Sequence, residues 1–200
     1  MKILKIVAIS ASTVLAAALL TACTVNVGTS DMKSDSGMMM DHGMMGDSSS
    51  EFSGEDIMFA QMMIPHHQQA VDIGTLAETR ASDPEVKALA AKIKGEQSPE
   101  IAQMKSWLSA ANAPMEMDHD MGMGGMDGML DAAQMDALTN SKGAAFDKLF
   151  LDAMIAHHKG AIQMAKMVVS SKNAEAAALG KAIIDSQTKE ITLMESLLAK

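Results

Sequence analysis

Two pairs of adjacent histidines are the residues of this sequence best suited to chemistry. The pairs are His66–His67 and His157–His158, and each follows a methionine, Met63 or Met154, that lies three residues before its first histidine. Imidazole nitrogen and thioether sulfur are ligands that soft and borderline transition metals prefer. The two pairs therefore predict binding of a soft metal ion, first of all copper.

Methionine is also concentrated in residues 24–52 and 113–129, which together hold twelve of the 22 methionines and few other apolar residues. Thioethers carry no proton to lose and form no disulfides, so they suit Cu(I) or Ag(I) outside the cytoplasm. Each of these two segments also contains a histidine next to Asp, and these side chains could hold Cu(II). Low-complexity sequence or a sacrificial target of oxidation is the alternative. The candidate ligands in these segments are His42, His119, Met38, Met39, Met40, Met44, Met45, Met115, Met117, Met121, Met123 and Met126.

The first histidine of each pair falls in the middle of an apolar helical stripe, at about 100° per residue. Gln97 and Gln187 interrupt the stripes of two further helices at a corresponding level, so the sequence predicts a polar layer halfway along a bundle. Two interpretations of His66 and His157 stay open. They could be metal ligands, or they could form hydrogen-bonded pairs with the glutamines that only fix the helix register.

The second histidine of each pair is expected at the edge of its stripe, where no packing role requires imidazole. His67 lies four residues after Met63, and His158 lies four residues after Met154, so each pair of side chains shares a helix face. The same methionines are three residues from the first histidines. Both spacings predict two-ligand clips, whereas Met104, Met135 and Met194 are expected to fill the core.

The second half of the chain repeats the first. Residues 59–71 match residues 150–162, and residues 97–108 match residues 187–198. Each half is predicted to form a helical hairpin, and two hairpins joined by a long crossover give an all-α, ferritin-like four-helix bundle. The expected helices are about 54–80, 84–110, 131–171 with a break near residues 139–143, and 173–199.

The N-terminus resembles a bacterial lipoprotein signal. Lys2 and Lys5 precede an apolar run, and the segment Leu20–Cys23 ends in the only cysteine of the chain, which would receive lipid. A transmembrane helix is the alternative, but the apolar run is short for one. We therefore expect an exported lipoprotein anchored to a membrane, in the periplasm or at the cell surface. The expected domains are a signal peptide (1–22), a disordered Met-rich tether (23–52) and the bundle (53–200), itself a hairpin (53–110), a Met-rich loop (111–130) and a second hairpin (131–200).

Charge and motif content exclude several functions. The chain carries a net charge of −9, and −11 once Lys2 and Lys5 are removed (14 basic against 25 acidic residues), which argues against nucleic acid as a partner. No arrangement of a nucleophile with a base is apparent, so the protein is not expected to be an enzyme or to need an organic cofactor. A di-iron centre would need Glu-x-x-His, which neither histidine pair has. Oxidation of Cu(I) and a metal-free surface or stress role stay open as alternatives.

The motif Met-Ile-Pro-His-His-x-x-Ala, its repeat Met-Ile-Ala-His-His-x-x-Ala and the endings Gln-x-x-Glu-Ile-x-x-Met resemble the bacterial "domain of unknown function" family that includes CopM-like periplasmic copper metallochaperones. The resemblance covers residues 55–199 and implies a ferritin-like bundle that binds copper or confers copper resistance. One departure is that Met164 corresponds to Ile73, so the two sites are not expected to be identical. The resemblance assigns ligand roles to Met63, His66, His67, Met154, His157, His158 and Met164.

Together these observations predict a lipoprotein that binds copper, as Cu(I), Cu(II) or both, and also suits Ag(I). It would sequester the ion or deliver it to a copper exporter or another copper-handling protein.

Overall fold

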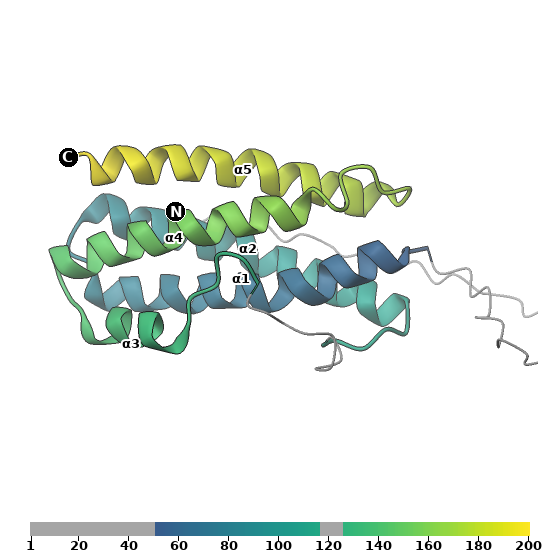
Figure 1. Ribbon diagram of the computed structural model, residues 1–200, viewed down its shortest axis with the longest axis horizontal. Coiled ribbons are helices and arrows are strands. Elements are labelled where there is room, and N and C mark those ends of the chain that lie inside the picture. Colours follow the sequence, from purple (N-terminus) through teal and green to yellow (C-terminus); the bar gives the residue numbers. More distant parts are fainter. Residues whose placement is uncertain (1–50, 117–125) are drawn as a thin grey trace, which may run out of the picture. The chain divides into compact units, whose positions relative to one another are not determined.

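All the regular elements in the described part of the chain are helices. The computed structural model describes residues 51–116 and 126–200. The predicted signal peptide, Cys23 and nearly all of the tether lie outside these residues. Among the described helices, none has an apolar stretch long enough to cross a membrane. The helices are α1 (Gly54–Arg80), α2 (Pro84–Ala110), α3 (Ala132–Asn140), α4 (Ala144–Ala165) and α5 (Ala174–Leu198) (Figure 1).

The helices begin at side chains that satisfy their first free N–H groups. Ser53 and Asp56 form a reciprocal capping box at the start of α1. Asp83 caps α2, with Pro84 at the first helical position, and Asn173 caps α5. These three starts agree with those predicted from the sequence.

The predicted third helix is divided into α3 and α4. The break at residues 141–143 falls where it was expected, and Gly143 there has a φ of 65°, a conformation that favours glycine. α4 ends at Ala165, earlier than the predicted residue 171. Met167 and Val168 instead donate to carbonyl groups three residues back, at 3.0 and 3.2 Å, which forms tight turns.

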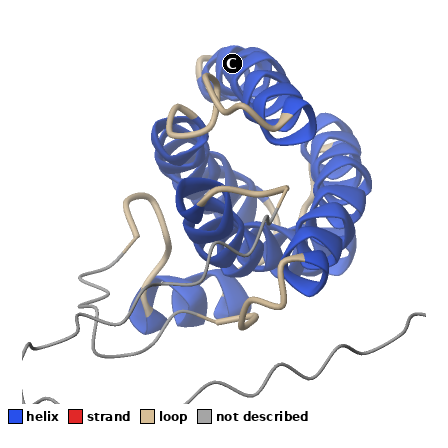
Figure 2. Cartoon of the chain, turned by 90° about the vertical axis from the view of Figure 1, so that its right-hand side faces the viewer, coloured by secondary structure: helices blue, strands red, loops and turns tan. Residues whose placement is uncertain are grey.

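The two hairpins are α1–α2 and α4–α5. Figure 2 looks along the bundle and shows the long helices α1, α2, α4 and α5 around a common axis, with the short helix α3 outside them. Asp147 at the start of α4 accepts hydrogen bonds from the backbone N–H groups of Ser82 and Asp83, both at 3.0 Å, in the turn of the first hairpin. Asp147 therefore fixes the second hairpin to the first at this end.

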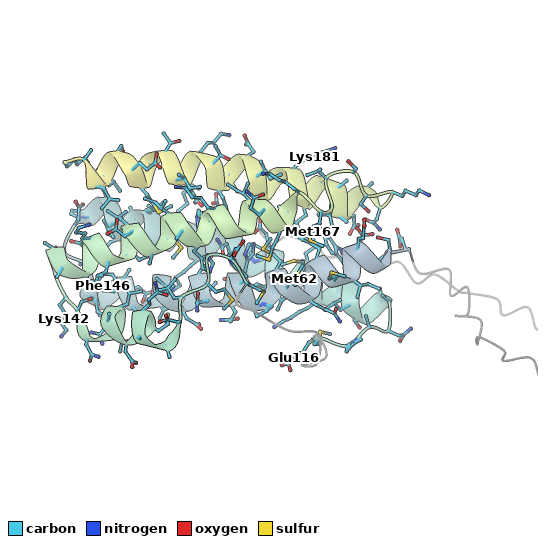
Figure 3. All side chains as sticks on the ribbon, viewed as in Figure 1. Met62, Glu116, Lys142, Phe146, Met167 and Lys181 are labelled. Carbon is cyan, nitrogen blue, oxygen red and sulfur yellow. The ribbon has the colours of Figure 1, made fainter. Side chains whose placement is uncertain are left out.

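The apolar core is divided into two clusters by the polar layer. One cluster contains Phe146, Phe150 and Met154 with the parts of α1, α2 and α5 beside them. The other contains Phe59, Met63 and Met104 with the opposite ends of the same helices. Figure 3 shows Phe146 toward one end of the bundle and Met62 and Met167 toward the other. The histidine pairs lie between the two clusters.

Candidate metal centre

His66 from α1 and His157 from α4 meet in the middle of the bundle. Their ring centroids are 3.7 Å apart, and both side chains are fully buried. Each ring lies at nearly the same distance from the second histidine of its own pair, 6.4 Å for His66–His67 and 6.3 Å for His157–His158. The four imidazoles therefore form one layer with approximate two-fold symmetry, as the sequence repeat requires.

Burial within the histidine layer favours the uncharged form of His66 and His157. Burial, together with a smaller effect of positive charge on His67, lowers the pKa of His66 to about 3. Burial likewise holds the pKa of His157 well below its ordinary value, and the neighbouring His66 acts in the same direction. A neutral imidazole has a lone pair on one ring nitrogen, so both rings can act as metal ligands near neutral pH.

The hydrogen-bonded pairs of histidine and glutamine, one of the two interpretations that the sequence left open, do not form. Within the described part of the chain, neither ring nitrogen of His66 or His157 has a hydrogen-bond partner, and neither does Oε1 of Gln97 or Gln187. The reason is that the two central histidines face each other across the bundle rather than facing α2 and α5. A buried polar atom without a partner costs about 1–3 kcal/mol. A layer that served only to fix the helix register would be expected to pair these atoms with one another.

The second histidines each bind a carboxylate from the partner helix of their own hairpin. Nε2 of His67 lies 2.8 Å from Oε2 of Glu100, and Nε2 of His158 lies 2.8 Å from Oε2 of Glu190. Since a carboxylate only accepts, Nε2–H donates in each case and the neutral ring carries its lone pair on Nδ1. Among the described residues Nδ1 of both rings has no partner. A carboxylate that orients a histidine in this way is the usual support of a metal-bound imidazole.

The prediction that His67 and His158 lie at the edge of their stripes was wrong. Both side chains are 0% exposed, because α2 and α5 cover the flanks of α1 and α4 that a single helical wheel leaves open. Glu100 and Glu190 belong to the histidine layer through these bonds, and the sequence reasoning did not include them in the candidate site. The signal was present, since both glutamates occupy the same position of the repeated Gln-x-x-Glu motif.

Thioether sulfur flanks the histidine layer on both sides. Met63 and Met104 belong to one apolar cluster, and Met154 and Met194 belong to the other; all four are fully buried. Met63 lies one helical turn before His67 in α1, and Met154 lies one turn before His158 in α4. Each methionine therefore shares a helix face with its histidine, as the predicted clips require. Met164 is half-buried against the cluster of Met63. Soft donors are therefore available next to the imidazoles.

The end of the Met-rich crossover packs directly against the layer. The side chain of Gln69 donates to the carbonyl of Leu130 at 2.9 Å and accepts from its N–H at 2.8 Å. Gly128, with a φ of 88°, lies so close to α4 that an added Cβ would be 3.0 Å from Cα of His157. At the other end of the crossover, Gln61 donates to the carbonyl of Pro114 at 2.9 Å. Both ends are thus held on α1.

Most predicted ligands of the Met-rich segments lie outside the described residues. Met115 is exposed and Met126 is half-buried, and both belong to the described ends of the crossover. Within residues 51–116 and 126–200, no group of three or more His, Cys, Asp or Glu side chains is placed to hold a metal. A site in this region would therefore combine the imidazoles with methionine. The predicted ligands that are not described are His42, His119, Met38, Met39, Met40, Met44, Met45, Met117, Met121 and Met123.

Comparisons with known proteins give one family and several similar structures. The sequence profile described as "Domain of unknown function (DUF305)" matches residues 56–198. No curated protein sequence matches the chain significantly. A DUF305 protein from Streptomyces coelicolor, described as a candidate secreted protein, is 34% identical with a TM-score of 0.68, over 72% of this chain and 92% of its own. A DUF305 fragment from Deinococcus radiodurans is 28% identical with a TM-score of 0.67, over 74% and 97%.

CopM is a third similar structure. In its Cu(I)-bound form it is 33% identical to this chain, with a TM-score of 0.60, over 71% of this chain and 94% of its own. CopM has also been solved in Cu(II)-bound, silver-bound and apo forms.

Proposed function

Because the chain belongs to the DUF305 family and places two oriented, unpaired imidazoles in its core, we propose that it binds copper. The ion is Cu(I) or Cu(II), and Ag(I) fits the same donors. The observation that carries the proposal is that His67 and His158 each give one nitrogen to a glutamate and keep the other free of partners from the described residues. The copper- and silver-bound forms of CopM support the choice of metal.

We further propose that the protein sequesters or hands over copper outside the cytoplasm and does not transform a substrate. Methionine and neutral histidine hold Cu(I) without needing to lose a proton, which suits reversible binding. The N-terminal sequence that resembles a lipoprotein signal and ends at Cys23 supports export and anchoring to a membrane, where the bundle would meet a copper exporter or another copper-handling protein. The similarity to a DUF305 protein described as a candidate secreted protein supports the same location.

The test is competition for Cu(I) between the mature protein and a coloured Cu(I) chelator. The informative variant is His67→Gln together with His158→Gln. The amide nitrogen of Gln can take the place of Nε2 and keep the hydrogen bond to each glutamate, whereas the Nδ1 donor is lost. We expect the variant to fold like the wild type by circular dichroism and to lose the tightest Cu(I) sites.

The control is Gln68→Ala, which changes an exposed side chain of the same helix that bonds only Asp72 among the residues described. It should bind Cu(I) like the wild type. If the double variant competes as well as the wild type does, His67 and His158 are not copper ligands. X-ray absorption at the copper edge of the loaded wild type would then count nitrogen and sulfur neighbours, and a sulfur-only shell would place copper on the methionines alone.

A further inference from the structure

The two histidine–glutamate pairs differ in what covers them. The glutamate of the second pair, Glu190, also accepts a hydrogen bond from Lys92 at 2.8 Å, and its side chain is only 4% exposed. Glu100 has no such contact with a lysine among the described residues, and its side chain is 18% exposed.

The sequence repeat explains the difference. Glu100 and Glu190 are 90 positions apart, so the residue that corresponds to Lys92 is Ala182, and the residue that corresponds to Glu96 is Ser186. Around Glu190, the long side chains of Lys92 and Glu96 bond to each other at 2.7 Å. Around Glu100, the corresponding side chains are too short to reach the carboxylate.

A groove lies where those short side chains leave room. It runs between α2 and α5, has a volume of about 370 Å³, and reaches Glu100, the partner of His67. Its wall contains two carboxylates, of which Glu96 is also bound by Lys92, and no basic side chain lines it. The residues that line it are Glu96, Pro99, Glu100, Gln103, Leu179, Ala182 and Ser186.

We propose that this groove is the entrance through which a metal cation reaches the histidine layer, and that Lys92 closes the equivalent entrance to His158. This inference rests on the proposed copper-binding function and adds its route. His67 and Glu100 form the loading side of the layer, and ions reach His158 from within the bundle. Ala182 and Lys92 are the residues that determine the route, without being ligands themselves.

Electrostatics favours this assignment. A groove lined by carboxylates concentrates cations and raises their rate of entry, by a factor that reaches ten or more when a low-dielectric wall surrounds it. A lysine ammonium at the other entrance repels an incoming cation and occupies the carboxylate that would first receive it. Lys92 and His158 each bond to the carboxylate of Glu190, so opening this entrance would break hydrogen bonds to a charged group.

The experiment moves the lysine between the two entrances. Stopped-flow mixing of the apo mature protein with a coloured Cu(I)–chelator complex follows the transfer of Cu(I) to the protein. The wild type should load in a fast and a slow phase, and His67→Gln should remove the fast one while His158→Gln spares it. Ala182→Lys should slow the fast phase about tenfold, and Lys92→Ala should speed the slow phase.

The matched control is Ala102→Lys, which adds the same charge to an exposed position of α2 that does not line the groove. Equal loading rates for Ala182→Lys and Ala102→Lys, with both variants folded by circular dichroism, would overturn the entrance while leaving copper binding intact. Loss of the fast phase in His158→Gln instead of His67→Gln would also overturn it. If the wild type takes no Cu(I) from the chelator, the entrance and the proposed function both fail.

Discussion

Substituting Gly160 by alanine should lift the crossover turn off the histidine layer without changing any candidate ligand. A Cβ at this position of α4 would lie 1.7 Å from the carbonyl oxygen of Asp127 and 2.6 Å from its carbonyl carbon. Both are backbone atoms, so no side-chain rotation relieves the overlap and the turn must move. Gly95 in α2 is the matched control, because an added Cβ there meets no described atom within 4 Å.

The magnitude follows from what the turn would lose. Its displacement breaks the two hydrogen bonds between Gln69 and the backbone of Leu130, which are worth about 1 kcal/mol each. Replacing glycine by alanine inside a helix contributes about 1 kcal/mol in the opposite direction. Gly160→Ala should therefore lower the free energy of unfolding by about 1 kcal/mol, whereas Gly95→Ala should raise it by about 1 kcal/mol. The two variants should differ by about 2 kcal/mol.

Urea unfolding of the apo protein, followed by circular dichroism, measures both values on the same scale. Gln69→Leu provides a second way to release the turn, since it removes both hydrogen bonds and introduces no overlap with Asp127. It should cost about 2 kcal/mol. If Gly160→Ala stabilises the protein as much as Gly95→Ala does, the turn is not docked as described and the reasoning is refuted.

Three further outcomes are expected. Acidification from pH 7 to 5 should destabilise the apo protein by about 2 kcal/mol through His66 alone, because its folded pKa of about 3 lies below the unfolded value of 6.5. That stability is present above pH 6.5 and is lost as the pH falls toward 3; urea midpoints that do not change between pH 7 and 5 would contradict it. Glu190→Gln should lower the free energy of unfolding by about 1–3 kcal/mol, and Glu100→Gln by less, since only Glu190 also binds Lys92; equal urea midpoints would show that the lysine contributes nothing. Copper bound at the exposed Met115, which follows the end of α2, should quench the fluorescence of the buried Trp107, and Met115→Leu should weaken the quenching.

Most of the helical framework was predictable because its signals are local. Ser53 with Asp56, and Asp83 with Pro84, determine where α1 and α2 begin through bonds within a few residues of each other. The repeat then predicted that His66 and His157 lie at the same level, which the 3.7 Å ring separation confirms. Capping and periodicity suffice for these features, since neither depends on which helices become neighbours.

The environment of the second histidines was not predictable in the same way. A helical wheel assigns His67 to the edge of a stripe because it considers one helix at a time. Its burial and its bond to Glu100 depend on how α2 lies against the flank of α1. The difference between Lys92 and Ala182 was visible in the aligned repeats, but its meaning required the contact between Lys92 and Glu190 across the bundle.

The crossover explains why two equivalent positions of the repeat have diverged. Gln69 and Gly160 each lie three residues after the first histidine of their pair, so they are counterparts in α1 and α4. A single crossover joins the two described hairpins, and its described end packs against both helices at this level. It cannot be two-fold symmetric, so one helix must bind the turn and the other must make room for it. Gln69 does the first through two hydrogen bonds, and Gly160 does the second by lacking a Cβ. A symmetric pair at these positions, two glutamines or two glycines, would leave the turn either blocked or unattached, and the Met-rich segment would then no longer end beside the histidines.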